Sequence, residues 1–161
     1  MAKRYWLMKS EPDDFSWEDL LEAEDHTTAW TGVRNYQARN LMRDEMRIDD
    51  GVLFYHSNIK TPAIVGIARV SGLAHPDDTQ FDRRSKYFDA RSSTESPRWV
   101  CVDIQAEKEL ARPVSRDELK EHPELDGLML LKKGARLSVQ PVSREHWNFI
   151  LRLARSKPTH S

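Results

Sequence analysis

Several short stretches of the chain are rich in apolar residues and end at turn residues, a pattern typical of β-strands. This pattern predicts strands over residues 5–9, 52–56, 63–71, 99–105 and 137–142, and in 99–105 the apolar residues also alternate, with Val100, Val102 and Ile104 on one face. The second and third stretches are joined by the short polar loop 57–62, so we expect a hairpin there. Gly66 inside the third stretch indicates a bulge or a close approach of another part of the chain.

Apolar residues at helical spacing follow four residues that are good N-caps. These caps are Ser16, Asn35, Ser115 and Ser143. The helix after Asn35 is expected over residues 36–47. The strands and helices do not alternate regularly, as they would in βαβ units. We therefore predict an α+β fold with a mostly antiparallel sheet, which can close into a small β-barrel with surrounding helices.

Composition limits the classes of function. The 161 residues carry a formal net charge of −1, whereas a domain that neutralises many phosphates is usually strongly basic. The single cysteine, Cys101, excludes an internal disulfide and fits a reducing compartment. No run approaches the ~20 apolar residues of a membrane span. We expect a soluble, cytoplasmic monomer with one domain over residues 1–155 and a tail over 156–161.

The stretch 29–40, A-W-T-G-V-R-N-Y-Q-A-R-N, combines an aromatic plane, a turn, a cation and an amide. Trp30 and Gly32 belong to a loop that leads into the helix capped by Asn35. Backbone N–H groups converge at such a helix end, where a flat or anionic ligand group can be held. This arrangement is typical of one wall of a nucleobase pocket. A core tryptophan followed by an ordinary capped helix is the alternative.

Two basic segments are candidates for contact with phosphates. Arg39, Arg43 and Arg47 lie four residues apart and form one stripe of a helix, although such a stripe is more often a solvated face. The long irregular segment 73–97 contains Arg83 and Arg84. Loops of this length are usually functional or mobile, so a lid or a nucleic-acid contact is expected.

Six sequence blocks, in this order, resemble the EVE domain family. They are K-S-E-P at 9–12, W-T-G-V-R-N-Y-Q-A-R-N at 30–40, F-Y-H-S-N at 54–58, D-D-T-Q-F at 77–81, P-R-W-V-C-V-D at 97–103 and R-L-S-V-Q-P at 136–141. The resemblance implies a PUA-like fold and kinship with YTH domains, which hold a methylated adenine in an aromatic cage. It also implies binding of modified bases in DNA or RNA, cytosine derivatives in particular.

A nucleobase needs π-faces to stack on and a few donors and acceptors along its edge. Trp30 supplies one face, and Tyr55 or Trp99 is expected to supply the other. The remaining ligand-binding candidates are Lys9, Ser10, Val33, Arg34, Asn35, Ser57 and Asn58. The candidates for the nucleic-acid backbone are Arg39, Arg43, Arg83 and Arg84.

Two other classes of function are open. The related ASCH domains include an amidohydrolase that acts on acetylated cytidine, and Lys9 with Glu11 can in principle form a general acid/base pair. The sequence has no metal-ligand spacing, no phosphate-binding glycine loop and no nucleophile arrangement. We therefore assign no catalytic, metal or cofactor residue, and interpret His56 and Cys101 as packed residues. The third class is a protein-interaction domain that uses residues 83–98.

Overall fold

The structure is a computed structural model that describes residues 3–156. Its strands are β1 (Tyr5–Ser10), β2 (Thr27–Ala29), β3 (Gly51–His56), β4 (Ala63–Pro76), β5 (Val100–Ser115) and β6 (Val139–Val142). Its α-helices are α1 (Trp17–Glu22), α2 (Tyr36–Asp44), α3 (Arg116–Lys120) and α4 (Arg144–Arg155). Short 3₁₀ turns are η1 (Glu24–His26), η2 (Asp78–Phe81), η3 (Pro123–Leu125) and η4 (Met129–Leu131).

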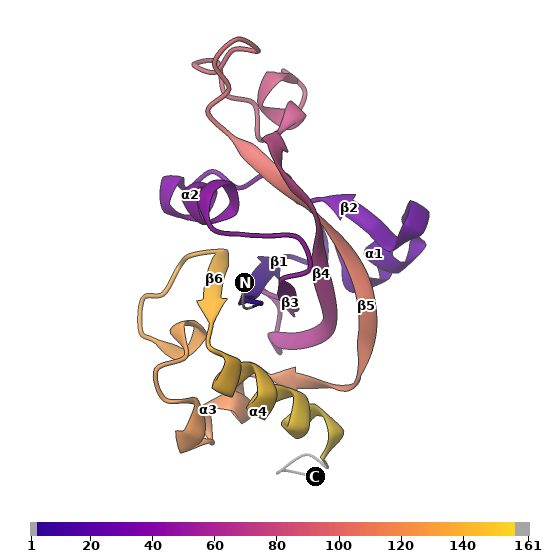
Figure 1. Ribbon diagram of the computed structural model, residues 1–161, viewed down its shortest axis with the longest axis vertical. Helices are drawn as coiled ribbons and strands as arrows, with labels where there is room; N and C mark the ends of the chain where they lie inside the picture. The colour runs from indigo at the N-terminus through magenta and orange to yellow at the C-terminus, as the bar shows by residue number, and fades with distance from the viewer. Residues whose placement is uncertain (1–2, 157–161) are drawn as a thin grey trace.

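The strands form one sheet in the order β2-β5-β4-β3-β1-β6. Strands β1 and β3 pair in parallel, while the other pairs are antiparallel. This arrangement confirms the predicted α+β class, the mostly antiparallel sheet and the β3–β4 hairpin. Figure 1 shows β4 and β5 as long, curved neighbours that run through the molecule. Their pairing is interrupted by several register shifts, which let long strands bend.

One strand was missed, and several of the predicted strands differ in extent, with β5 running on to Ser115. Strand β2 was not predicted, because its three residues depend on pairing with β5. The segment predicted to be irregular from residue 73 begins as a continuation of β4, where His75 pairs with Cys101. Strand β6 starts at Val139, two residues later than expected. In each case the cross-strand partner decides where the strand ends.

Both faces of the sheet are buried. Alternation along β3 sends Val52 and Phe54 to a core beneath α1 and α2, while Leu53 and Tyr55 face a second core beneath α3 and α4. Every residue of β3 is therefore buried. Within residues 3–156, no helix has both the length and the apolar character to cross a bilayer.

The four predicted N-caps are confirmed. Ser16 and Asp19 form a full capping box at α1, and Asn35 accepts from the backbone N–H of Ala38 at 3.0 Å. Ser115 and Ser143 cap α3 and α4 in the same way. Helix α2 ends at Asp44, before the predicted position 47.

Gly66 is a point of close approach, as predicted. A Cβ atom at this position would lie 2.5 Å from the Trp17 ring, and the β4–β5 register shifts next to it.

A buried glutamine closes the base of the loop 82–99. Gln80 donates from Nε2 to the carbonyls of Asp77 and Trp99, both at 2.8 Å, and its Oε1 accepts from the backbone N–H groups of Arg98 and Trp99. The side chain is fully buried. The loop therefore leaves and rejoins the sheet at one fixed point, beyond the upper ends of β4 and β5 in Figure 1.

Candidate functional site

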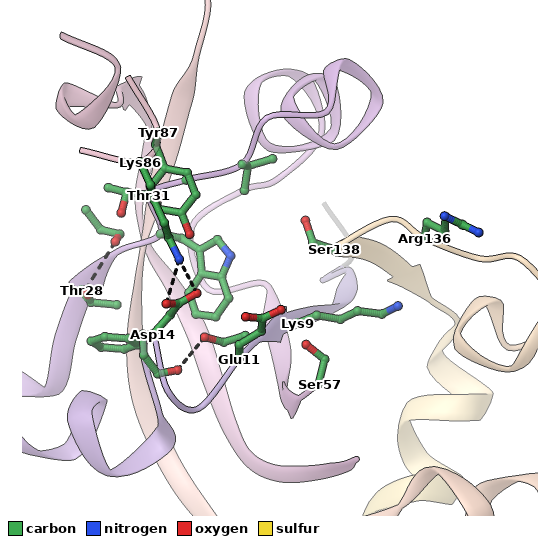
Figure 2. Close-up of a pocket in the computed structure, with 16 residues that line it drawn as sticks. Lys9, Glu11, Asp14, Thr28, Thr31, Ser57, Lys86, Tyr87, Arg136 and Ser138 are labelled. Atoms are coloured by element: carbon green, nitrogen blue, oxygen red, sulfur yellow. Dashed lines mark hydrogen bonds and ion pairs between the residues drawn. The ribbon is translucent and has the colours of Figure 1, made fainter. Parts of the chain in front are cut away.

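A cleft of about 630 Å³ opens where four segments of the chain meet. The segments are the end of β1, the loop after β2, the loop 82–99 and the approach to β6. The lining residues are Lys9, Ser10, Glu11, Asp14, Phe15, residues 28–33, Ser57, Lys86, Tyr87, Arg136 and Ser138. Figure 2 shows Asp14, Lys86 and Tyr87 on one side of the cleft and Lys9, Arg136 and Ser138 on the other.

The carboxyl ends of the parallel strands β1 and β3 bring hydroxyl groups to the cleft. The backbone N–H of Ser57 donates to the Ser10 carbonyl at 2.9 Å. The backbone N–H of Lys9 donates to the Ser138 carbonyl at 2.8 Å. Three segments distant in sequence are thereby joined side by side. The predicted residues Lys9, Ser10 and Ser57 all line the cleft.

Trp30 belongs both to the core and to the cleft wall. Its backbone N–H donates to the Val102 carbonyl at 2.8 Å, just beyond the last β2 residue. Its ring packs edge-on against Phe54, with centroids 5.4 Å apart, and the side chain is 7% exposed. Within residues 3–156 the indole N–H has no hydrogen-bond acceptor, and it is not completely shielded from solvent. This donor remains available to a ligand. Val33, also predicted, lines the same wall.

Tyr87 forms a second aromatic wall that the sequence did not single out. Gly32 has a φ of +87°, and a Cβ atom there would lie 2.7 Å from the Tyr87 ring. Position 32 therefore requires glycine, because any side chain there would clash with the Tyr87 ring and would be strained at this φ. Lys86, its neighbour, forms an ion pair with Asp14 at 2.8 Å, on the same side of the cleft in Figure 2.

Arg34 lies behind the cleft and holds its wall together. The guanidinium donates to the Tyr87 carbonyl from Nε at 3.0 Å and from Nη2 at 2.8 Å. It also donates to Asp77 Oδ2 at 3.1 Å, and Asp77 accepts from the backbone N–H of Gly32 at 2.8 Å. Burial acts to raise the pKa of Asp77, but hydrogen bonds from Thr79, Gly32 and Arg34 lower it overall. Arg34 is thus placed as a structural clamp.

The remaining predicted ligand residues lie outside the cleft. Tyr55 faces the second core, because it alternates with Phe54 along β3. Trp99 stacks on Tyr36 and donates from its indole N–H to Asp89. Asn35 uses its side chain as the α2 cap.

Asn58 is the last of these residues. It has a φ of 57° and donates to Glu11 Oε1 at 3.1 Å, so it positions a residue that lines the cleft.

The charges at the cleft fall into paired and unpaired groups. Glu11 and Asp14 have the partners named above, whereas the side chains of Lys9 and Arg136 have none within the described part of the chain. Burial, together with the charge of Arg116, lowers the pKa of the Lys9 amino group. The cleft thus contains a half-buried amine that is easier to deprotonate than an ordinary lysine.

The predicted backbone-binding arginines differ in whether their guanidinium groups already have partners. Arg39 donates to the Arg98 carbonyl at 2.9 Å and to Asn40. Arg43 forms an ion pair with its neighbour Asp44 at 2.9 Å. Arg83 and Arg84 are exposed, and their guanidinium groups have no partner among residues 3–156.

Two reactive side chains are held as packed groups. His56 Nε2 accepts from the backbone N–H of Trp17 at 3.0 Å, and burial lowers its pKa. Burial and nearby carboxylates raise the pKa of the Cys101 thiol to about 12. Residues 3–156 contain no cluster of three or more His, Cys, Asp or Glu side chains suited to a metal ion.

Sequence reasoning missed several lining residues, chiefly Asp14, Lys86, Tyr87, Arg136 and Ser138. Only weak signals could have found them. Lys86 and Tyr87 lie in the long basic segment, and Arg136 and Ser138 lie in a block that the family resemblance includes. Their proximity to Trp30 follows from the fold.

Comparisons with known proteins agree with this description. The EVE domain family model matches residues 4–153. Thymocyte nuclear protein 1 of Rattus norvegicus is 41% identical over 171 residues, which cover 96% of this chain and 75% of the relative. A crystal structure of protein PSPTO5229 from Pseudomonas syringae has a TM-score of 0.88 at 44% identity, covering 93% of this chain and 99% of that one.

Two further structures bear on the ligand and on the fold. The human THYN1 protein was crystallised in complex with DNA that contains 5-methylcytosine. It has a TM-score of 0.90 at 38% identity, covering 97% of this chain and all of that one. A mutant ASCH protein from Zymomonas mobilis has a TM-score of 0.53 over 94% of this chain and 99% of that one. At 10% identity this likeness concerns the fold alone, and it agrees with a PUA-like architecture.

Proposed function

The chain belongs to the EVE domain family, and on this basis we propose that its cleft binds a modified nucleobase of a nucleic acid without catalysing a reaction. The first candidate is 5-methylcytosine, since a related human protein was crystallised with DNA that contains this base. DNA is accordingly the first polymer to test, with RNA as the second.

The observation that carries this proposal is a cleft with aromatic walls and unused polar groups. Trp30 and Tyr87 line it, and stacking on an aromatic ring contributes about 1–3 kcal/mol per base. The Trp30 N–H, the hydroxyls of Thr31, Ser57 and Ser138, and the Lys9 amine have no partner among the described residues. Such groups can read the edge of a base.

The size of the cleft is compatible with one extruded base. Its volume of about 630 Å³ lies within the ordinary range of small-molecule pockets. A base inside a duplex cannot reach such a site, so it must be flipped out or come from a single strand. A methyl group adds about 0.8 kcal/mol of burial, so we expect roughly fourfold preference for 5-methylcytosine over cytosine.

Calorimetric titration with single-stranded oligonucleotides tests the proposal. Each oligonucleotide carries one central cytosine or 5-methylcytosine. We expect saturable 1:1 binding, and Tyr87→Ala should weaken it by about 1–3 kcal/mol, or roughly 5- to 150-fold. Tyr36→Ala is the matched control, because Tyr36 is an exposed aromatic residue outside the cleft. Equal loss in both variants, or no saturable binding of wild type, would refute the proposal.

Trp30 requires a milder substitution. Trp30→Ala would open a cavity beside Phe54, and removing a buried tryptophan costs about 3–5 kcal/mol of stability. Trp30→Phe keeps a ring while removing the indole N–H. We expect this variant to remain folded and to bind the base more weakly than wild type.

The lowered pKa of Lys9 favours a second candidate function, hydrolysis of a modified nucleoside. A neutral amine could act as a general base. The proposed partner Glu11 is exposed and bonded to Asn58, which leaves Lys9 without a carboxylate there. Incubation with acetylated cytidine decides between the two functions, because released cytidine and acetate would support the enzyme.

A further inference from the structure

A second, smaller cavity of about 430 Å³ adjoins the cleft. It lies between the start of α2 and the segment that leads from η4 to β6. Its lining residues are Asn35, Gln37, Met129, Lys132, Lys133, Gly134, Ala135, Arg136 and Leu137. Arg136 lines both cavities, so the two adjoin at this residue. We call the second one the basic cavity.

The lining of the basic cavity carries three positive charges and no carboxylate. Within residues 3–156, the side chains of Lys132, Lys133 and Arg136 have no hydrogen-bond or ion-pair partner. Exposed basic residues without partners occur elsewhere too, as Arg83 and Arg84 show, but here three such charges line one cavity that contains no carboxylate. An anionic ligand is the chemistry that this lining fits.

The backbone presents these charges on an open turn. The N–H of Ala135 donates to the Lys132 carbonyl at 3.1 Å. Gly134, at a φ of +77°, has no atom within 4 Å of where a Cβ would lie. The first turn of α2 adds the positive end of its dipole next to Gln37. The basic cavity is therefore accessible as well as positively charged.

We propose that the basic cavity binds the phosphodiester backbone of the strand whose base occupies the cleft. This inference rests on the proposed function. The strand then runs from the cleft across Arg136 to Lys132 and Lys133. Contacts to phosphates position a strand without reading its sequence, so the modified base alone is read in the cleft. A net charge near zero is compatible with this arrangement, because few phosphates are contacted.

The test is the double variant Lys132→Ala/Lys133→Ala, with Lys108→Ala/Lys120→Ala as the matched control. Lys108 and Lys120 are exposed and lie on β5 and α3, outside both cavities. Binding of a single-stranded 5-methylcytosine oligonucleotide is measured over a range of salt concentrations. We expect the test variant to lose about tenfold in affinity at ~0.1 M salt and to flatten the log–log salt slope by about 1.4. The control should match wild type.

Binding of the nucleoside 5-methyl-2′-deoxycytidine separates this inference from the proposed function. The nucleoside has no phosphate, so its affinity should be equal in wild type and in the Lys132→Ala/Lys133→Ala variant. If wild type binds the oligonucleotide and the test variant keeps both affinity and salt slope, the backbone path is wrong while the proposed function stands. If wild type binds neither the oligonucleotide nor the nucleoside, the proposed function is refuted, and the inferred backbone path with it.

The direction of the path provides a second readout. Oligonucleotides are extended on only the 5′ side or only the 3′ side of the modified base. The inferred path leaves the cleft over Arg136 on only one side of the modified base. The Lys132→Ala/Lys133→Ala variant should therefore bind the oligonucleotide extended on that side more weakly, and the other oligonucleotide as wild type does. Equal weakening of both would contradict a defined path through the basic cavity.

Discussion

Two aromatic clusters adjoin the Arg34 guanidinium, and they differ in whether their indole N–H groups are already bonded and whether their rings line an open cleft. The Trp99 cluster consists of Tyr36 and Trp99, whose rings stack at 4.7 Å and 24°. The Arg39 guanidinium lies 4.6 Å from the Tyr36 ring, and the Trp99 N–H donates to Asp89 at 2.8 Å. This cluster is complete without a ligand.

The cleft cluster consists of Trp30 and Tyr87. It also has neighbouring cations, since Lys86 Nζ lies 5.2 Å and the Arg34 guanidinium 5.5 Å from the Tyr87 ring. Both of its aromatic residues line an open cleft, and the Trp30 N–H has no acceptor in the described structure. The same residue types thus stabilise the fold in one cluster and leave room for a base in the other.

Substitution of Trp99 should produce the largest effect. Trp99→Ala removes a buried ring and leaves the Asp89 Oδ2 atom without its donor, so we expect the free energy of unfolding to fall by about 3–5 kcal/mol. Urea denaturation followed by circular dichroism measures this change. Tyr87→Ala should cost less stability than Trp99→Ala, because the Tyr87 ring is only partly buried and lines the open cleft. Similar losses in the two variants would mean that the clusters do not differ as described.

Stability should also depend on pH through His56, which lies near the cleft cluster. Burial lowers the pKa of His56, which packs against Phe54 beneath Trp30, from its ordinary 6.5. Between 6.5 and the lower folded value, the unfolded chain binds more protons, so stability should fall as the pH drops below 6.5. His56→Gln should remove this part of the pH dependence. If the dependence of stability on pH is unchanged in His56→Gln, another titrating group causes it.

In the Trp99 cluster, Asp89 contributes to the loss of stability in acid, as Asp77 does at the cleft wall. Hydrogen bonds from Trp99 and from the backbone of Arg91 lower the pKa of Asp89 from 3.8 to about 2. The stabilisation from this carboxylate is present above pH 3.8 and is lost as the pH falls through about 2. Trp99 fluorescence in the variant Asp89→Asn should lack the wild-type change over this range.

Lys9→Met should produce the smallest effect on stability, and whether stability rises or falls shows whether the charged amine has a stabilising partner. Burial disfavours the charged amine, as its lowered pKa indicates, so a neutral side chain of similar length should stabilise the fold slightly. Thermal denaturation at pH 7 should show a small increase in Tm, while affinity for the oligonucleotide decreases. A lower Tm would imply that Lys9 has a stabilising partner.

Sequence reasoning predicted the features that depend on neighbours along the chain. The N-caps Ser16, Asn35, Ser115 and Ser143 were predicted because each bonds to an N–H three residues ahead. The apolar runs predicted the strands, and the six sequence blocks predicted the family and its fold. Trp30, Lys9, Ser10, Val33 and Ser57 line one cleft, and their contact with a ligand remains a prediction.

The tertiary structure alone decided which groups remain free at the cleft. Tyr87 reaches the Trp30 loop through Arg34, a residue 53 positions away in sequence. Asn58 and Glu11, which meet across 47 positions, show the same long range. Side-chain type gives the chemistry that a residue can perform, whereas its partners determine whether that chemistry is already used within the fold. Those partners come from distant segments, and no local pattern encodes them.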